Sequence, residues 1–562
     1  MGPLRRAPGH EVDSEENGGY FVGIKHQNQT ITEENMKIIF INPSSFNDSG
    51  RDLYSAHIAA PLFTFQPNTK MTLGIPLALP TLAAVTPSEF ELKIIDEEIE
   101  DIDFDEPADI VAITAMTFKA KRAYEIAREF RARGVKVIMG GIHASMCPDE
   151  VSEHVDCVVV GEAENIWPSL LIDAVEGKLK KRYVGQGLPD LKISRTPRYD
   201  LVKIDQYLYA YLQTTRGCPF DCTFCTVTKM SGRTVRKKTP EQVIEDVSSI
   251  INLKHKQTFD MIDRMANQKM KVVKMIAFID DNFAIDRKHA LAICHALKRF
   301  QMEHNVAIPW YTQTNVEVGF DEELLTAMSA ANCQHLFIGF ESLDMATLQS
   351  MQKNINSPER YEEAIQNIHN HGIRVVFSTI IGDDNTSRQS AEYLKAFIEK
   401  NNILHVLLNI LTPYPGTKLF EEMTKEGRIL TDQSELYNIR NVVFKPRNMA
   451  ARELQELFNS LSSSIYQYDN MYKRGENLFK PASRLYFSFL DRVLIWIGLS
   501  FTSLYLVCQG KLRIKIALRI LIKAPYLILF HGSLFAIELL AISADYDDFA
   551  HCEAKRLKED KN

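Results

Sequence analysis

Three cysteines lie close together near the middle of the chain, in the segment QTTRGCPFDCTFCTVTK (residues 213–229). Cys218, Cys222 and Cys225 have the spacing C-x3-C-x2-C, in a chain of 562 residues that has nine cysteines. Nine is too few, and odd, for a disulfide framework in a chain of this length. Clustered thiols of this kind therefore favour metal binding or catalysis.

The number of thiols distinguishes between kinds of metal site. A structural zinc site takes four protein ligands, commonly as two separated pairs, and no second pair lies near this segment. Cubic iron–sulfur clusters are usually held by four thiolates. Three thiolates leave one iron free to bind a small molecule, which indicates an active rather than a structural cluster. A structural zinc knuckle and three unrelated thiols are the alternatives.

The cysteine segment resembles the signature of the radical S-adenosylmethionine (SAM) superfamily, in which an aromatic residue, here Phe224, precedes the last cysteine. The preceding TTRGCPFDC is typical of the branch that carries a cobalamin-binding domain in front. The resemblance implies that Cys218, Cys222 and Cys225 hold a [4Fe–4S] cluster whose open iron chelates SAM, with Phe224 beside it. An external donor of the flavodoxin or ferredoxin type would supply the electron that cleaves SAM to a 5′-deoxyadenosyl radical.

Short β-branched runs alternate with helical patterns in residues 36–185. The runs are 36–45, 90–98, 108–117, 135–145 and 155–164, and the helical patterns are 75–85, 118–134 and 165–177. This alternation predicts a parallel, doubly wound, Rossmann-like sheet, whose ligands bind at the carboxyl ends of the strands. Small or polar residues stand at those ends: Asn42, Thr114, Ala115, Gly140, Gly141, Gly161 and Glu162.

The layout of this first domain resembles the cobalamin-binding domain. The resemblance implies that these strand-end residues, together with His143, line a cobalamin site. The family's D-x-H-x-x-G motif, whose histidine ligates cobalt, corresponds here to IIDEEIEDI, in which no histidine follows Asp96. We therefore expect cobalamin without a histidine nitrogen on cobalt, and a polar contact from His143. The alternative is a vestigial domain that binds no cobalamin.

A second series of strand-like runs and helices fills residues 205–430. The runs are 209–217, 273–281, 309–316, 335–342, 374–382 and 405–413, with clear helices at 287–301, 321–332 and 359–372. Six such units predict a partial (β/α)6 barrel with its reactive groups at the strand ends, and the cysteine segment follows the first run. The resemblance implies SAM contacts at Asp281, Asn282, Glu341, Ser378, Gly382 and Leu411. For Glu341 a helix cap is the alternative.

The two ends of the chain differ from these domains. Residues 1–35 are polar and without periodicity, which predicts disorder, and no secretory signal is visible, which favours the cytoplasm. Residues 431–562 read as helical, and 493–508 and 524–537 are uncharged runs that flank a basic stretch. Each run is shorter than the roughly 20 residues of a membrane span, so 484–543 fits helices lying on the membrane surface. A buried helical cap and a two-span hairpin are the alternatives.

Three functions fit these observations. The first is a cobalamin-dependent radical methylase that acts on an unactivated carbon of a hydrophobic, lipid-like acceptor. The second is a radical oxidoreductase or cyclase of the same architecture on a tetrapyrrole or lipid, and the third is a non-catalytic iron–sulfur or cobalamin sensor. A net charge of −7 gives no basic signal for nucleic acid. A methylthiotransferase would need further cluster cysteines in its first domain, where this chain has only Cys147 and Cys157.

Overall fold

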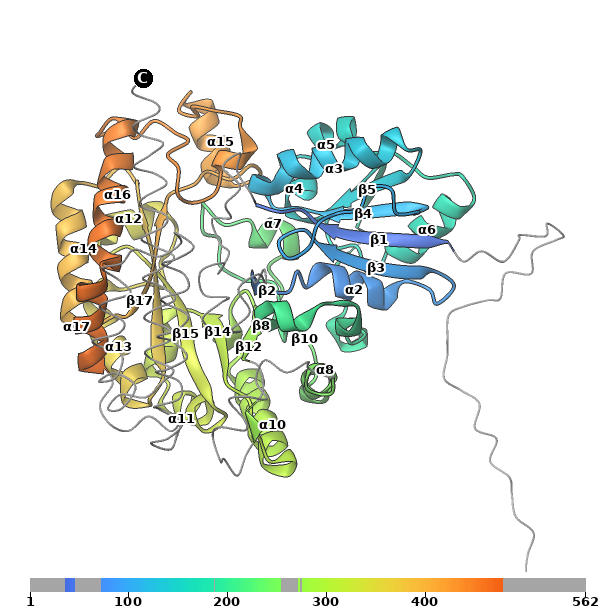
Figure 1. The fold of residues 1–562 in the computed structure, drawn as a ribbon. Helices are drawn as coiled ribbons and strands as arrows, with labels where there is room; N and C mark the ends of the chain where they lie inside the picture. The colour runs from blue at the N-terminus through green and yellow to red at the C-terminus, as the bar shows by residue number, and fades with distance from the viewer. Residues whose placement is uncertain (1–35, 46–71, 186, 254–270, 273–274, 479–562) are drawn as a thin grey trace, which may run out of the picture. The chain divides into compact units, whose positions relative to one another are not determined.

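The computed structural model describes residues 36–45, 72–185, 187–253, 271–272 and 275–478 (Figure 1). The N-terminal segment 1–35, predicted to be disordered, and the apolar and basic runs of 484–543 lie outside the described residues. Within the ranges given, no helix is both long and apolar enough to cross a membrane.

The first sheet is parallel and has six strands in the order β3-β1-β4-β5-β6-β7. The strands are β1 (Lys37–Asn42), β3 (Glu91–Asp96), β4 (Ile110–Thr114), β5 (Lys136–Gly140), β6 (Cys157–Val160) and β7 (Arg182–Val184). Because β1 lies between β3 and β4, the order is that of flavodoxin-like sheets, in which ligands bind outside the carboxyl ends of the strands where the order reverses.

Helices cover both faces of this sheet, as alternate residues of β1 show. Ile39 and Ile41 pack with α3 (Ala120–Ala132), which contributes the buried Phe130. Ile38 and Phe40 pack in the opposite layer with α2 (Ala78–Val85) and α6 (Trp167–Val175). Figure 1 shows α3 and α2 on opposite sides of the sheet. A strand covered on both faces must be apolar at every position, which explains the continuous run IIFI in β1.

The second sheet is also parallel and has seven strands in the order β17-β16-β15-β14-β12-β8-β2. They are β8 (Tyr207–Leu212), β12 (Ile276–Phe278), β14 (Trp310–Thr314), β15 (Cys333–Glu341), β16 (Arg374–Ile381), β17 (His405–Ile410) and β2 (Thr72–Gly74). The first six follow one another in chain order, with helices such as α10 (Arg287–His304), α11 (Glu322–Ala330) and α13 (Tyr361–Asn370) between them. The predicted α/β class, with a doubly wound sheet and a partial barrel, is confirmed.

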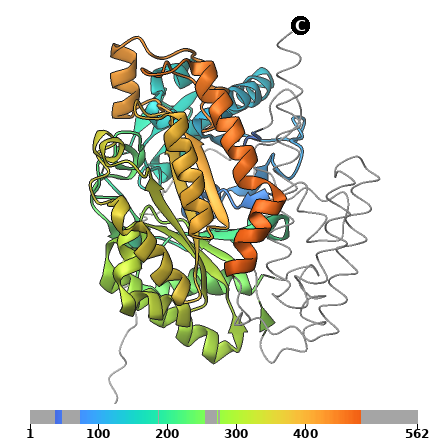
Figure 2. The same ribbon diagram turned by 90° about the vertical axis from the view of Figure 1, so that its left-hand side faces the viewer.

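Two features of the second sheet were not expected from the sequence. The seventh strand, β2, comes from before β3 in the chain and pairs with β8. Its Gly74 lies against the ring of Tyr211, where a Cβ atom would be 2.0 Å away. At the other edge, the Tyr466 hydroxyl of α16 (Ala451–Tyr466) donates to the Val406 carbonyl of β17 at 2.6 Å. Figure 2 shows α16 beside α14 (Arg388–Lys400), so helices cover the edge of the sheet that β17 would otherwise expose.

Candidate active site

The three cysteines follow β8 in the loop between β9 (Thr215–Arg216) and α7 (Val227–Ser231). All three thiols are free and half-buried. Within the described part of the chain, at least one pair of their three sulfur atoms is more than 4.8 Å apart. Two thiolates on one tetrahedral zinc ion would lie about 3.8 Å apart, given Zn–S bonds of about 2.3 Å. At least one pair of these thiols is therefore too far apart to share one zinc ion, whereas a larger group such as a [4Fe–4S] cube could span it.

Neighbouring segments hold the cysteine loop by its backbone. The amide of Thr223 donates to the carbonyl of Met351 at 3.1 Å, and the carbonyl of Thr223 accepts from the amide of Leu419 at 3.0 Å. At the start of the loop, Gly217 has a φ of +102°, and a Cβ atom there would be 2.4 Å from the Thr234 carbonyl. Only glycine fits that position, so the TTRGC sequence sets the path of the chain into Cys218.

The acids that follow β12 accept hydrogen bonds from the residues that lead into the same loop. The buried carboxylate of Asp280 accepts from the Thr214 amide at 2.6 Å and from the Thr215 hydroxyl at 3.0 Å. Burial raises the pKa of Asp280 to about 6. Asp281 accepts from the Gly217 amide at 2.7 Å. These bonds explain the polar sequence FIDDNF at a buried strand end; a SAM contact from Asp281 stays a prediction.

Glu341 at the end of β15 has a strained backbone. Its φ is +61°, and the pairing of β15 with β16 shifts register between Gly339 and Glu341. The carboxylate turns back over Gly339, where a Cβ atom would be 2.3 Å from Oε1, and accepts from the ammonium of Lys353 at 3.0 Å. A non-glycine residue in this region costs roughly 1–3 kcal/mol and is typical of functional sites. The N-cap of α12 (Met345–Ser350) is Asp344, so Glu341 does not cap that helix.

The other residues predicted to contact SAM lie at or near the carboxyl ends of the strands. Ser378 lies inside β16, where it is buried and accepts from the Asn409 amide at 3.4 Å. The amide of Gly382, whose φ is +105°, donates to the Thr386 hydroxyl at 2.8 Å, and the amide of Leu411 donates to the Ile381 carbonyl at 2.8 Å. Asn282, after β12, accepts from Thr314 at 3.1 Å, and Phe224 is half-buried in the loop. Because the sheet is parallel, all these ends meet at one edge.

A cavity of about 260 Å³ lies at the carboxyl ends of β4, β5 and β6. Five residues predicted for cobalamin line it: Thr114, Gly140, Gly141, Gly161 and Glu162. Residues that flank the cysteine loop line it too, namely Gln213, Arg216, Met230 and Ser231. Gly141 has a φ of +90°, and its Cβ would be 2.5 Å from the Thr114 hydroxyl. Glycines of this kind let a flat group approach the backbone closely, and the volume suits one part of a cobalamin molecule.

Three other predicted cobalamin residues lie at or near the same edge but do not line the cavity. The Asn42 amide donates to Asp96 at 2.7 Å, and the Ala115 carbonyl accepts from the His143 amide at 3.1 Å. The buried ring of His143 points to α3, where its Nε2 is 2.8 Å from the Tyr124 hydroxyl. His143, Cys147 and Glu150 have ligand atoms within 4.8 Å of one another, but the Tyr124 hydroxyl already bridges His143 and Glu150.

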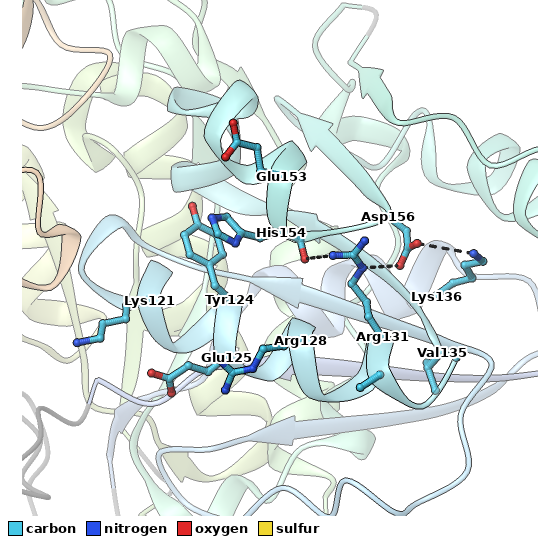
Figure 3. A pocket seen from close by; sticks show the side chains of 12 residues that line it. Lys121, Tyr124, Glu125, Arg128, Arg131, Val135, Lys136, Glu153, His154 and Asp156 are labelled. Atoms are coloured by element: carbon cyan, nitrogen blue, oxygen red, sulfur yellow. Dashed lines mark hydrogen bonds and ion pairs between the residues drawn. The ribbon is translucent and has the colours of Figure 1, made fainter.

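A groove of about 760 Å³ lies at the opposite end of this sheet (Figure 3). Its wall includes Lys136, the first residue of β5, and Asp156, which precedes β6. Arg131 and Lys136 both pair with Asp156, at 3.5 and 3.6 Å, and Tyr124 stacks on His154 with ring centres 3.9 Å apart. The groove thus runs along the outer side of α3 to the amino ends of β5 and β6, and none of the residues predicted to bind a cofactor lines it.

The sequence did not reveal the partners of Glu162. Its buried carboxylate accepts from Arg216 at 2.7 Å and from Arg236 of β10 (Arg236–Lys237) at 2.6 and 2.8 Å. Arg216 also pairs with Glu164 at 2.6 Å. Glu162 follows β6 of the first sheet, whereas Arg216 stands two residues before Cys218. The ion pairs therefore join the cavity of the first sheet to the cysteine loop of the second.

Replacing Glu162 with alanine is expected to destabilise the protein by about 3–5 kcal/mol, because the largely buried Arg236 loses its carboxylate partner, while Arg216 keeps Glu164. The measurement is the urea midpoint of unfolding of the apoprotein. Glu164→Ala is the matched control, since both arginines keep Glu162 as their partner there, and a smaller loss of stability is expected. Equal losses in the two variants would show that Glu162 has no special role.

The structure combines a doubly wound domain with a partial barrel and places three free thiols after the first barrel strand. Three family models match the chain: the radical SAM superfamily at residues 212–398, the B12 binding domain at 72–171, and a domain of unknown function (DUF4070) at 417–515.

Curated relatives and a solved structure agree with these matches. A bacteriochlorophyllide d C-8(2)-methyltransferase of Chlorobaculum tepidum is 30% identical over 380 residues, which are 66% of this chain and 80% of that protein. The hopanoid C-2 methylase of Rhodopseudomonas palustris is 28% identical over 370 residues, 65% of this chain and 67% of that protein. The cobalamin-dependent SAM radical enzyme OxsB, solved with aqua-cobalamin and SAM bound, shares the fold at 14% identity, with a TM-score of 0.56 over 94% of this chain and 81% of that one.

The chain belongs to the radical SAM enzymes that carry a B12-binding domain in front of the barrel, the family of these methyltransferases. Its cofactors are a [4Fe–4S] cluster, SAM and cobalamin, as the sequence predicted. Which residues hold each cofactor stays a prediction, as do the exact domain boundaries.

Proposed function

We propose that this enzyme transfers a methyl group to an unactivated carbon of a hydrophobic, lipid-like acceptor. The proposal rests mainly on one cavity that both domains line. Arg216 and Met230, which flank the cysteine loop, line it together with Gly140 and Gly141 of the first domain. A radical formed at the loop and a methyl carrier bound at the glycines would thus act next to each other. The names of the methyltransferase and methylase relatives support this reading.

The cluster supplies the electron that cleaves SAM, and cobalamin supplies the methyl group. In this proposal Cys218, Cys222 and Cys225 hold the cluster, and the electron comes from an external flavodoxin- or ferredoxin-type donor. Asp281 keeps the loop in place through Gly217. Glu341, with its strained backbone beside the loop, is the residue that we expect to orient SAM.

A hydrophobic acceptor is favoured by two observations. The relatives act, by their names, on a bacteriochlorophyllide and on hopanoids, which are large ring compounds with apolar faces. The sequence of 484–543 combines apolar runs with the basic residues Lys511, Arg513 and Lys515, a composition that suits contact with the headgroups of the cytoplasmic membrane face. We propose that the enzyme takes its acceptor from that surface.

An acceptor screen tests the class of substrate. The anaerobically reconstituted protein, with SAM, cobalamin and a low-potential reductant, is incubated with a membrane lipid extract or with a tetrapyrrole extract. We expect a lipid fraction to gain the mass of one CH₂ group. The same gain confined to the tetrapyrroles would contradict the lipid-like acceptor, and a product that has lost hydrogen without gaining carbon would favour the oxidoreductase or cyclase function.

A further inference from the structure

A half-buried lysine lies beside the cysteine loop and has no part in the function proposed so far. The side chain of Lys353 is 16% exposed, and its ammonium donates to Glu341 at 3.0 Å. It follows α12, and the carbonyl of Met351, two residues earlier, accepts from the Thr223 amide inside the cysteine loop. The loop and the chain that carries Lys353 are therefore hydrogen-bonded neighbours.

The position of the ammonium is fixed by its surroundings. A Cβ atom on Gly339 would be 3.3 Å from Nζ of Lys353 and 2.3 Å from Oε1 of Glu341. Both charged groups thus lie over the same glycine at the end of β15. The ammonium stays protonated, because the negative charge of Glu341 raises the pKa of Lys353 although burial lowers it.

The chain that carries Lys353 meets the cysteine loop next to one of its cysteines. The amide of Thr223, the residue after Cys222, donates to the carbonyl of Met351 at 3.1 Å, and Lys353 follows Met351 by two residues. The side chain of Lys353 is mostly shielded from water, so its charge is less screened than that of a surface lysine.

We propose that Lys353 is a positioning residue whose fixed positive charge makes the iron–sulfur cluster easier to reduce. The inference rests on the proposal that the three cysteines hold the cluster. Reduction adds one electron from an external reductant to the cluster, breaks no bond and moves no proton from Lys353. Because the reduced cluster carries one more negative charge than the oxidised one, a nearby cation stabilises the reduced form more. Glu341 opposes this effect.

The test is a potentiometric titration of the reconstituted full-length protein without SAM, followed by the electron paramagnetic resonance signal of the reduced cluster. Lys353→Met is expected to lower the equilibrium constant of one-electron reduction about tenfold, which is a shift of about 59 mV to more negative potential. Lys353→Arg keeps the charge and is expected to restore most of the potential. Glu341→Gln removes the opposing charge and is expected to shift the potential in the positive direction.

Two comparisons separate a charge effect from damage to the fold. Lys418→Met removes a cation that pairs with Asp221 of the cysteine loop at 2.6 Å but is 47% exposed, so its potential is expected to stay near that of the wild type. If the Lys353→Met protein binds no cluster, the inference is still tested by the reduction potential of Glu341→Gln, which is expected to be more positive than that of the wild type. An unchanged potential in Lys353→Met, or shifts of the same sign in Lys353→Met and Glu341→Gln, would overturn the inference. Absence of a cluster signal in the wild type would instead refute the cysteine site.

Discussion

A serine in place of Cys222 is expected to remove the iron–sulfur cluster and to abolish SAM cleavage. With three thiolates, one iron of the cube is already open for SAM, so the loss of one more leaves only two protein ligands. Changes beyond the ligand shell commonly cost 10–100-fold in metal affinity or activity, so loss of a ligand is expected to cost more than about a hundredfold. The measurements are iron content per chain and the rate of 5′-deoxyadenosine formation.

The control for this variant is Cys147→Ser. Cys147 is also free and half-buried, but it lies between α4 (Gly141–Met146) and α5 (Pro148–His154) in the first domain. Iron content and SAM cleavage are expected to match the wild type there. Normal iron and normal cleavage in Cys222→Ser would show that the cluster is held elsewhere.

An alanine in place of Gly141 is expected to weaken cobalamin binding at least tenfold while iron content stays unchanged. The φ of Gly141 is +90°, and the new Cβ would meet the Thr114 hydroxyl at 2.5 Å and the Ala115 backbone at 3.2 and 3.3 Å. The backbone at the mouth of the cavity must therefore shift, and tenfold weaker binding corresponds to about 1.4 kcal/mol. The dissociation constant is measured by the change in the cobalamin absorption spectrum.

Gly134→Ala separates crowding from backbone strain. Gly134 also has a positive φ, +81°, but nothing lies within 4 Å of its Cβ position. It follows α3, at the end of the sheet opposite the cavity, so the strain of the substitution is similar and the cavity is untouched. Wild-type cobalamin affinity in Gly141→Ala, or equal weakening in both variants, would refute the assignment of the cavity.

Local sequence patterns predicted five of the six strands of the first sheet, missing β7, six of the seven strands of the second sheet, and the place of the cysteine loop. The run IIFI in β1 could be recognised because a strand that is buried on both faces is apolar at every position. The segment FIDD at the end of β12 could be recognised because polar residues directly follow a buried strand. The strand β2 was missed because Thr72–Gly74 is only three residues long, too short for any periodicity. Its place depends on β8, which lies far along the chain.

Long-range charge pairs could not be predicted in the same way. Glu162 was expected to contact cobalamin, but its two arginine partners, Arg216 and Arg236, come from a different sheet. The same holds for the ion pair of Lys353 and Glu341, since a lone lysine after a helix usually faces solvent. One signal was available for Arg216: a basic residue directly before the glycine and cysteine of a metal-binding loop.

Radical methylation by this enzyme is tested most directly with SAM that carries a CD₃ methyl group, the reconstituted wild-type enzyme and the acceptor fraction found in the screen. We expect that 5′-deoxyadenosine forms and that the product carries one CD₃ group in place of one hydrogen, with both signals lost in Cys222→Ser. Product formation with no CD₃ group, or CD₃ transfer that continues in Cys222→Ser, would contradict cobalamin-dependent radical methylation by this enzyme.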